Sequence, residues 1–118
     1  MDPLRKQLTD PKIARLLKVI NLIRLYDRDV PGQVMATLLW VASHEGGHKT
    51  ALEMDLNLST ASTSRNTDWL AKKNPILGRP ALGLIVKEPD ETNKRRVTLS
   101  LSSKGRDLIK TIKEILYE

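Results

Sequence analysis

The stretch of sequence that decides the fold is residues 50–73, TALEMDLNLSTASTSRNTDWLAKK. Residues 50–56 have the composition of a short helix, and Asn57-Leu58 then turns the chain. Ser59 follows as the N-cap of a longer helix to about Lys73, because a serine hydroxyl accepts hydrogen bonds from the free N–H groups of a first helical turn. A short helix, a tight turn and a capped second helix in this order predict a helix-turn-helix.

The second helix of this pair consists mostly of small polar residues, STASTSRNTD over residues 59–68. Serine, threonine and asparagine are mediocre helix formers, so this composition favours a helix that enters a major groove of DNA. There Arg65 would pair with guanine, and Asn66 would read adenine if it points outward. The candidate DNA-binding residues are Ser59, Thr60, Ser62, Ser64, Arg65 and Asn66. A surface helix whose hydroxyls merely face water is the alternative.

A β-hairpin is predicted after this helix. Residues 84–86 have strand composition, residues 89–93 form a turn cluster, and residues 97–101 alternate apolar and polar side chains. Beside a recognition helix, such a hairpin is a wing whose basic side chains enter the minor groove. The candidate wing residues are Lys94, Arg95 and Arg96. Charges that protect an edge strand from aggregation are the alternative.

Helices are also expected on either side of this unit. Pro11 is placed to start a helix over about residues 12–28, with Asp10 as its cap, and Pro31 opens another helix that Gly46-Gly47 ends. The first helix has one apolar stripe that we assign to the domain core: Ile13, Leu16, Leu17, Ile20 and Ile23. It has a second stripe that we assign to a partner subunit: Val19, Leu22 and Tyr26. Burial of both stripes inside one monomer is the alternative.

A closing helix over residues 103–117 carries a further apolar stripe. We expect part of that stripe to complete the dimer interface: Ile112, Ile115 and Leu116. The whole chain, residues 1–118, is then a single domain, with the helix-turn-helix and the wing in residues 49–102 and the candidate dimerisation helices around them.

Charge is concentrated in the same central segment. The chain has 20 Lys+Arg against 14 Asp+Glu, a net charge of +6, and residues 49–106 contribute eleven basic and six acidic residues to that sum. A basic face confined to one part of a domain favours nucleic-acid binding over a merely solvated surface. Aromatic residues make up only 3% of the chain, which argues against base stacking on single strands and favours duplex DNA.

Other classes of protein find little support. The absence of cysteine excludes disulfides, cysteine-ligated zinc and thiol switches, and no apolar run approaches the ~18–20 residues of a membrane span. His44 and His48 are the only histidines, and Gly46-Gly47 between them interrupts the rigid helix that zinc-hydrolase motifs require. We therefore expect no enzyme activity, no metal and no cofactor.

Six short groups of residues resemble a known family. Leu58-Ser59, Ser62-Thr63-Ser64-Arg65 and Leu70 with Lys72-Lys73 resemble the recognition helix of MarR-type winged-helix transcription regulators. Gly83-Leu84-Ile85, the turn Asn93-Lys94-Arg95-Arg96 and Leu101-Ser102-Ser103-Lys104-Gly105 look like the wing of that family and the entry to its next helix. The resemblance covers roughly residues 50–110.

The resemblance implies a winged helix-turn-helix, mainly α with a small β-hairpin (α+β), and a homodimer whose terminal helices pair. It implies a sequence-specific regulator of transcription that binds double-stranded DNA at a pseudo-palindromic operator, in the cytoplasm of a bacterium or of a bacteriophage host. The alternative is a winged-helix accessory protein of DNA replication or recombination, or a protein–protein interaction module with non-specific nucleic-acid affinity. Nothing in the sequence indicates a small-molecule effector.

The sequence departs from the family pattern at two places. Asn93 stands where the family commonly has an acidic residue before the wing arginines. The loop of residues 75–83 is longer than in typical members. We expect it either to shift the wing or to add a DNA-backbone contact through Arg79.

Overall fold

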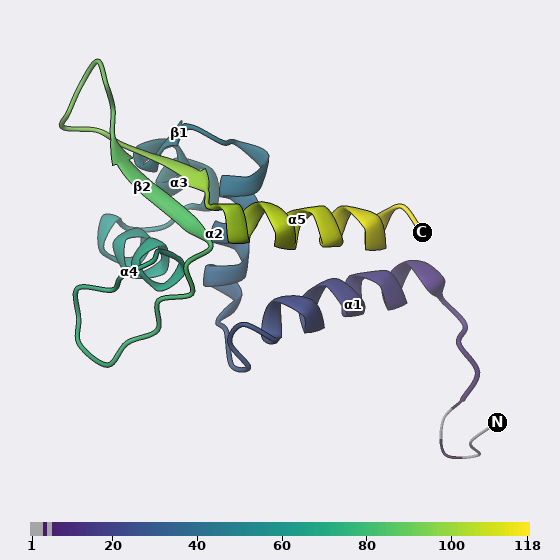
Figure 1. Cartoon of the computed structure of the whole chain (residues 1–118). Helices are drawn as coiled ribbons and strands as arrows, with labels where there is room; N and C mark the ends of the chain where they lie inside the picture. Colours follow the sequence, from purple (N-terminus) through teal and green to yellow (C-terminus); the bar gives the residue numbers. More distant parts are fainter. Residues whose placement is uncertain (1–3, 5) are drawn as a thin grey trace.

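The computed structural model of the chain describes Leu4 and residues 6–118. In chain order the elements are α1 (Pro11–Arg24), α2 (Gly32–Ser43), β1 (Gly47–His48), α3 (Lys49–Leu56), α4 (Thr60–Leu70), β2 (Ile85–Pro89), β3 (Val97–Leu101) and α5 (Ser103–Leu116). Figure 1 shows α1 and α5 running beside each other away from a body formed by the other elements. The predicted fold class, mainly α with a small antiparallel sheet, is confirmed.

The helix starts follow from the predicted caps. Asp10 is the N-cap of α1, which begins at Pro11. Its carboxylate accepts hydrogen bonds from the backbone N–H groups of Lys12 and Ile13 in the first turn. The Ser59 hydroxyl likewise accepts a hydrogen bond from the backbone N–H of Ser62 at the start of α4. Asn57 adopts a left-handed conformation with φ of 52° and makes the tight turn between α3 and α4. The predicted helix-turn-helix is therefore present, although α4 ends at Leu70, earlier than expected.

The sheet is a hairpin with one additional short strand. β2 pairs antiparallel with β3, from Ile85 opposite Leu101 to Pro89 opposite Val97. Pro89 is tolerated because β2 is an edge strand, where a missing N–H breaks no ladder. β1 pairs with the other side of β3, and the sequence did not predict it because two residues are too short to show an alternating pattern.

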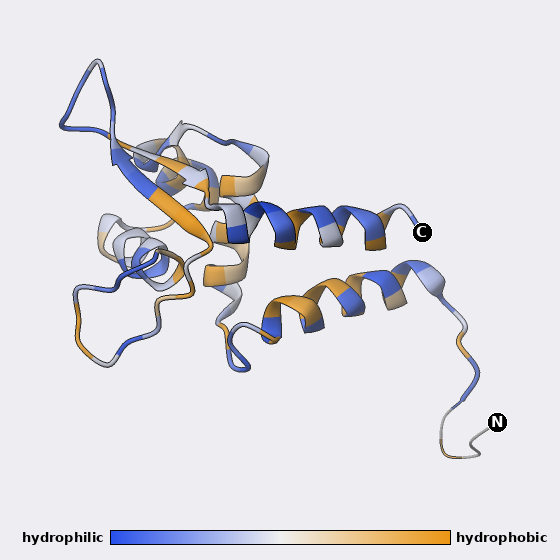
Figure 2. Ribbon diagram, viewed as in Figure 1, coloured by the Kyte–Doolittle hydropathy of each residue, from blue (hydrophilic) through white to orange (hydrophobic). Residues whose placement is uncertain are grey.

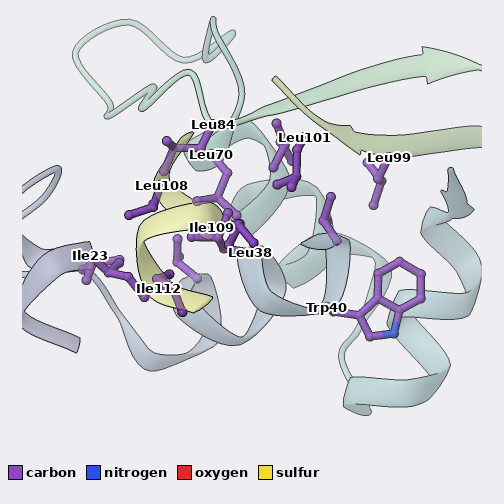
Figure 3. Packing of buried hydrophobic residues seen from close by; sticks show 14 of the residues in the cluster. Ile23, Leu38, Trp40, Leu70, Leu84, Leu99, Leu101, Leu108, Ile109 and Ile112 are labelled. Atoms are coloured by element: carbon purple, nitrogen blue, oxygen red, sulfur yellow. The ribbon is translucent and has the colours of Figure 1, made fainter. Parts of the chain in front are cut away.

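The hydrophobic core lies where α2 meets the sheet, the end of α4 and the start of α5 (Figure 3). Leu38, Leu84 and Leu99 are completely buried there, and Leu108 and Ile109 of α5 pack onto them. Two residues at the end of α4 anchor it there, because Leu70 is buried and the Trp69 ring packs against the same core. The helix-turn-helix is thus held on the body by its C-terminal end.

The structure contradicts the assignment of the α1 stripes for Val19 and for three residues of the stripe assigned to the core. Val19 is only 4% exposed, and Leu22 and Tyr26 are partly buried against the core of their own chain. In the stripe assigned to the core, Ile13, Leu16 and Leu17 are 62%, 51% and 58% exposed, whereas Ile23 is buried as predicted. We call Ile13, Leu16 and Leu17 the outer face of α1.

The closing helix requires a similar correction. Ile112 is only 4% exposed and Ile115 is partly buried, whereas Leu116 is 52% exposed. Figure 2 shows the apolar side of α5 turned toward α1, which is the physical reason for this burial. Ile112 and Val19 therefore belong to the core of one chain and are not free for a second subunit.

The start of α5 is joined closely to the hairpin. The Ser102 hydroxyl donates a 2.6 Å hydrogen bond to the Gly83 carbonyl and accepts one from the Gly105 N–H, while the Ser102 N–H donates to the Leu84 carbonyl. Gly105 is so close to this segment that a Cβ atom added there would lie 2.0 Å from the Leu84 carbonyl oxygen.

Among the described residues, no helix has the length and apolarity needed to cross a membrane.

Candidate nucleic-acid interface

The outward side of α4 carries most of the predicted recognition residues. Thr60 and Arg65 are exposed, and Ser62 and Ser64 are half-buried on the flanks of the helix. The Arg65 guanidinium donates a 3.0 Å hydrogen bond to the Ser62 hydroxyl. Arg65 is therefore held along the helix surface with other guanidinium N–H groups available for an acceptor outside the protein.

Asn66 does not lie on this outward side. Its side chain is 7% exposed and donates a 3.4 Å hydrogen bond to the amide oxygen of Gln33 on α2. The condition for reading adenine, that Asn66 points outward, is not met. Asn66 instead ties the recognition helix to α2.

The polar composition of α4 has a second cause that sequence reasoning missed. Thr63 and Thr67 are completely buried, and their hydroxyls donate to the carbonyl oxygens of Ser59 and Thr63 one turn earlier, at 2.9 and 2.8 Å. With their hydroxyls satisfied in this way, both threonines pack as core residues. The signal was present in the spacing of residues 63, 66, 67 and 70, which is that of a buried helix face.

Lys49 of α3 is a further residue of this surface that was not predicted. Its ammonium donates a 2.7 Å hydrogen bond to the Ser64 hydroxyl and lies 3.9 Å from a carboxylate oxygen of Glu53. Glu53 also accepts a 3.4 Å hydrogen bond from the Thr60 hydroxyl. These contacts fix the position of α4 against α3, and they keep two of its hydroxyls engaged within the protein.

The turn between β2 and β3, residues 90–96, is held at its base. The Asp90 N–H donates to the Arg96 carbonyl at 2.9 Å, and the Arg96 N–H donates to the Asn93 carbonyl at 2.9 Å. Asn93 also accepts a hydrogen bond from the Arg95 N–H through its side-chain oxygen. We call β2, β3 and this turn the wing.

Asp90 supplies a carboxylate that supports the wing turn, which Asn93, an amide, cannot supply. One of its oxygens accepts hydrogen bonds of 2.9 Å from the backbone N–H and the hydroxyl of Thr92, and the other contacts the Nε2 atom of His48 on β1. These donors, first the Thr92 N–H and then His48, lower the pKa of Asp90 from 3.8 to about 2. The contact links the wing turn to the strand that precedes the helix-turn-helix.

The predicted wing residues lie where they can contact a partner. Lys94, Arg95 and Arg96 are all exposed in the turn. Figure 1 shows the turn at the end of the hairpin, extending beyond the body on the side of the molecule where α4 lies. The structure therefore brings the exposed residues of α4 and the basic residues of the turn to one side of the protein.

The two histidines considered for a metal, and Glu45 between them, have other partners. The His44 ring stacks on Trp40, His48 contacts Asp90, and Glu45 accepts hydrogen bonds from the Leu101 N–H and from Arg106. Within the part of the chain that the structure describes, no three histidine or carboxylate side chains gather as metal ligands.

Comparisons with known proteins place the fold. No family model matches the sequence, and no curated protein matches it. Solved structures do match: the S. aureus MepR–DNA complex aligns with a TM-score of 0.67 at 16% sequence identity, over 89% of this chain and 79% of that chain. A MarR transcriptional regulator from Methanosarcina mazei Go1 aligns with a TM-score of 0.65 at 18% identity, over 91% and 69%. This chain has the MarR-type winged-helix fold.

A third solved structure, overoxidized AbfR bound to DNA, aligns with a TM-score of 0.61 at 15% identity, over 89% of this chain and 71% of that chain. In the MarR-type fold of this chain, α3 and α4 are the helix-turn-helix, and β2 and β3 are the wing. The long loop between α4 and β2, residues 71–84, leaves Arg79 exposed.

Proposed function

We propose that this protein is a sequence-specific regulator of transcription that binds double-stranded DNA as a homodimer. The observation that carries the proposal is that α4 and the wing turn lie on the same side of a winged-helix fold (Figure 1), and that Arg65 of α4 and residues 94–96 of the turn are exposed. Two structures with the same fold, MepR and AbfR, are complexes with DNA. The protein would act in the cytoplasm of a bacterium or of a phage host.

In this proposal α4 lies in a major groove. Arg65 makes a bidentate contact to guanine. The Ser62 and Ser64 hydroxyls, which act as acceptors within the protein, donate their own protons to phosphates or base edges, and Thr60, whose hydroxyl donates to Glu53, accepts from a base edge. Ser59 caps the helix end that approaches the DNA. Arg95, with Lys94 and Arg96, enters the adjacent minor groove, where the negative potential favours guanidinium groups.

The outer face of α1 supports the homodimer. Ile13, Leu16 and Leu17 form an apolar stripe that one chain leaves exposed, and Leu116 on the neighbouring helix α5 is exposed as well. A second copy that covered these residues would remove them from water, which stabilises association. The two recognition helices would then address two half-sites of a pseudo-palindromic operator.

The test is selection of bound sequences from a random duplex library, followed by gel-shift titration of the selected duplex in excess random DNA. The proposal predicts a palindromic motif and binding that survives the competitor. Equal affinity for all sequences, falling uniformly as salt rises, would overturn the proposal. That result would favour a winged-helix accessory protein that contacts only the DNA backbone.

A further inference from the structure

The loop between α4 and β2, residues 71–84, carries basic residues of its own, in addition to those of α4 and the wing. From Trp69 to Val86 the chain contains three basic residues and no acidic residue: Lys72, Lys73 and Arg79. All three are exposed, and none takes part in an ion pair within the described residues. By contrast, Lys87 on β2 is neutralised by Asp68 at 2.7 Å.

Backbone hydrogen bonds close the base of the loop against the end of α4. The N–H groups of Leu82, Gly83 and Leu84 donate to the carbonyl oxygens of Trp69, Ala71 and Leu70, at 2.9, 2.9 and 2.7 Å. The Lys104 ammonium on α5 donates a further 2.7 Å hydrogen bond to the Leu82 carbonyl. The loop is therefore fixed in position relative to the recognition helix.

The tip of the loop is also ordered by its own contacts. The Asn74 side chain donates to the Pro80 carbonyl at 3.1 Å and accepts from the Ile76 N–H at 3.0 Å. The Arg79 N–H donates to the Ile76 carbonyl, and Gly78 adopts φ of 82°, a conformation that favours glycine. Because this shape exists before any partner binds, little conformational entropy is lost when Arg79 makes a contact.

Figure 1 shows where the loop projects. In this view the loop and the wing lie on opposite sides of α4, and both extend away from the pair α1 and α5, toward the side of the molecule where α4 lies. In B-DNA a minor groove lies on each side of a given major groove. With α4 in the major groove and the wing in one flanking minor groove, the loop faces the other flanking minor groove.

We infer that the 71–84 loop is a second DNA-binding arm, with Arg79 in the minor groove on the far side of the recognition helix and Lys72 and Lys73 on the adjoining phosphates. The inference rests on the proposed function and extends its contacts from two consecutive grooves to three. Duplex DNA is the partner that the charge favours, because a run of basic residues without one acidic residue suits a polyanion.

The experiment uses the full chain and the highest-affinity duplex from the random-library selection. A variant with Lys72→Ala, Lys73→Ala and Arg79→Ala is compared with the wild type by gel-shift titration over a range of salt and by hydroxyl-radical footprinting. We expect affinity to fall roughly tenfold or more at physiological salt, and the slope of log K against log[salt] to fall by about 0.9 for each phosphate that the variant no longer neutralises. The footprint should lose minor-groove protection on one side of the recognition-helix site and keep the wing protection on the other.

The matched control removes the same charge elsewhere, with Lys12→Ala, Lys110→Ala and Lys113→Ala on the exposed sides of α1 and α5. It should leave the footprint intact. If the loop variant keeps the affinity, the salt slope and the footprint of the wild type, the loop serves another partner such as an acidic protein, and the inference is overturned while the proposed function stands. If the wild type binds no duplex, both fail together.

Discussion

Arg65 and Asn66 are neighbours in the chain, yet α4 turns one toward solvent and the other into the protein. Each residue advances the helix by about 100°, so the face that buries Leu70 also takes Thr67, Asn66 and Thr63. What a side chain of α4 can do is therefore decided by its angle around the helix, and residue type alone does not predict it.

Arg65→Ala should weaken binding to the selected duplex. We expect a loss of about 1–3 kcal/mol and a relaxed preference at one base pair of each half-site, because a bidentate contact to guanine is removed. Gel-shift titration against duplexes with each base at that position measures both effects. An equal loss on every sequence would show that Arg65 contacts only phosphate.

Asn66→Ala should act on stability and leave sequence preference unchanged. The variant removes a buried hydrogen bond and leaves the Gln33 amide oxygen without this donor, so we expect the free energy of unfolding to fall by about 1–3 kcal/mol. Urea unfolding followed by circular dichroism measures this change. A change in the preferred base, with stability unaltered, would contradict the inward orientation.

Asp90 should titrate near pH 2. Folding lowers the pKa of Asp90, so its carboxylate stabilises the folded wing turn fully at pH values above 3.8, the ordinary pKa of an aspartate. This stabilisation is lost as the pH falls through about 2. NMR detection of the Asp90 carboxyl carbon against pH measures the midpoint. His48→Gln is the matched variant and should raise that midpoint, because it disrupts one of the contacts to the carboxylate. A midpoint near 3.8 in the wild type would show that the contacts to Thr92 and His48 do not form in solution.

At the scale of elements, the parts with strong local signals were predictable. Asp10, Pro11, Asn57 and Ser59 mark helix ends through caps and turns that depend only on nearby residues, and these predictions are confirmed. The alternation over residues 97–101 likewise predicted β3. These signals need no knowledge of the rest of the molecule.

The parts that depend on distant neighbours were not predictable. α1 carries apolar residues on two sides, and its sequence alone cannot show which side α5 and the core will cover. Asp90 receives its support from His48, which is far away in sequence and comes close only because β1 pairs with β3. The candidate site was therefore predicted as a surface, while its internal supports, Lys49, Gln33 and His48, were missed.

Gly105→Ala should destabilise the fold. The added methyl group would lie 2.0 Å from the Leu84 carbonyl oxygen, so the first turn of α5 or the end of the loop must move. We expect a loss of about 1–3 kcal/mol of unfolding free energy, measured by urea denaturation.

The matched control for this variant is Gly32→Ala, also at the start of a helix, where a Cβ atom meets nothing within 4 Å. It should leave stability nearly unchanged. Equal stability of the two variants would mean that α5 does not pack against Leu84 as described.

At the scale of the whole molecule, the correction to α1 moves the expected dimer interface to the outer face. Leu16→Glu with Leu17→Glu should give a folded monomer, because both side chains are exposed in one chain and only a second copy would bury them. Sedimentation equilibrium measures the mass, and circular dichroism verifies the fold.

Two controls sharpen this test. Leu77→Glu makes the same type of substitution once, on a leucine that is fully exposed in the 71–84 loop, and it should leave the mass of a dimer unchanged. Ile112→Ala should instead lower the free energy of unfolding by about 2–5 kcal/mol, because Ile112 is a core residue. A dimer that persists in the Leu16/Leu17 variant would exclude the outer face as the interface.

The close approach of Gly105 to Leu84 has a mechanical consequence. The first turn of α5 is bound to residues 82–84 at the end of the 71–84 loop through Ser102, Lys104 and Gly105, and only Ser102 separates α5 from β3. We therefore expect the pair α1 and α5, the 71–84 loop and the wing to move as one rigid unit. A tilt of α5 imposed from its C-terminal end would then change the orientation of the loop and the wing together.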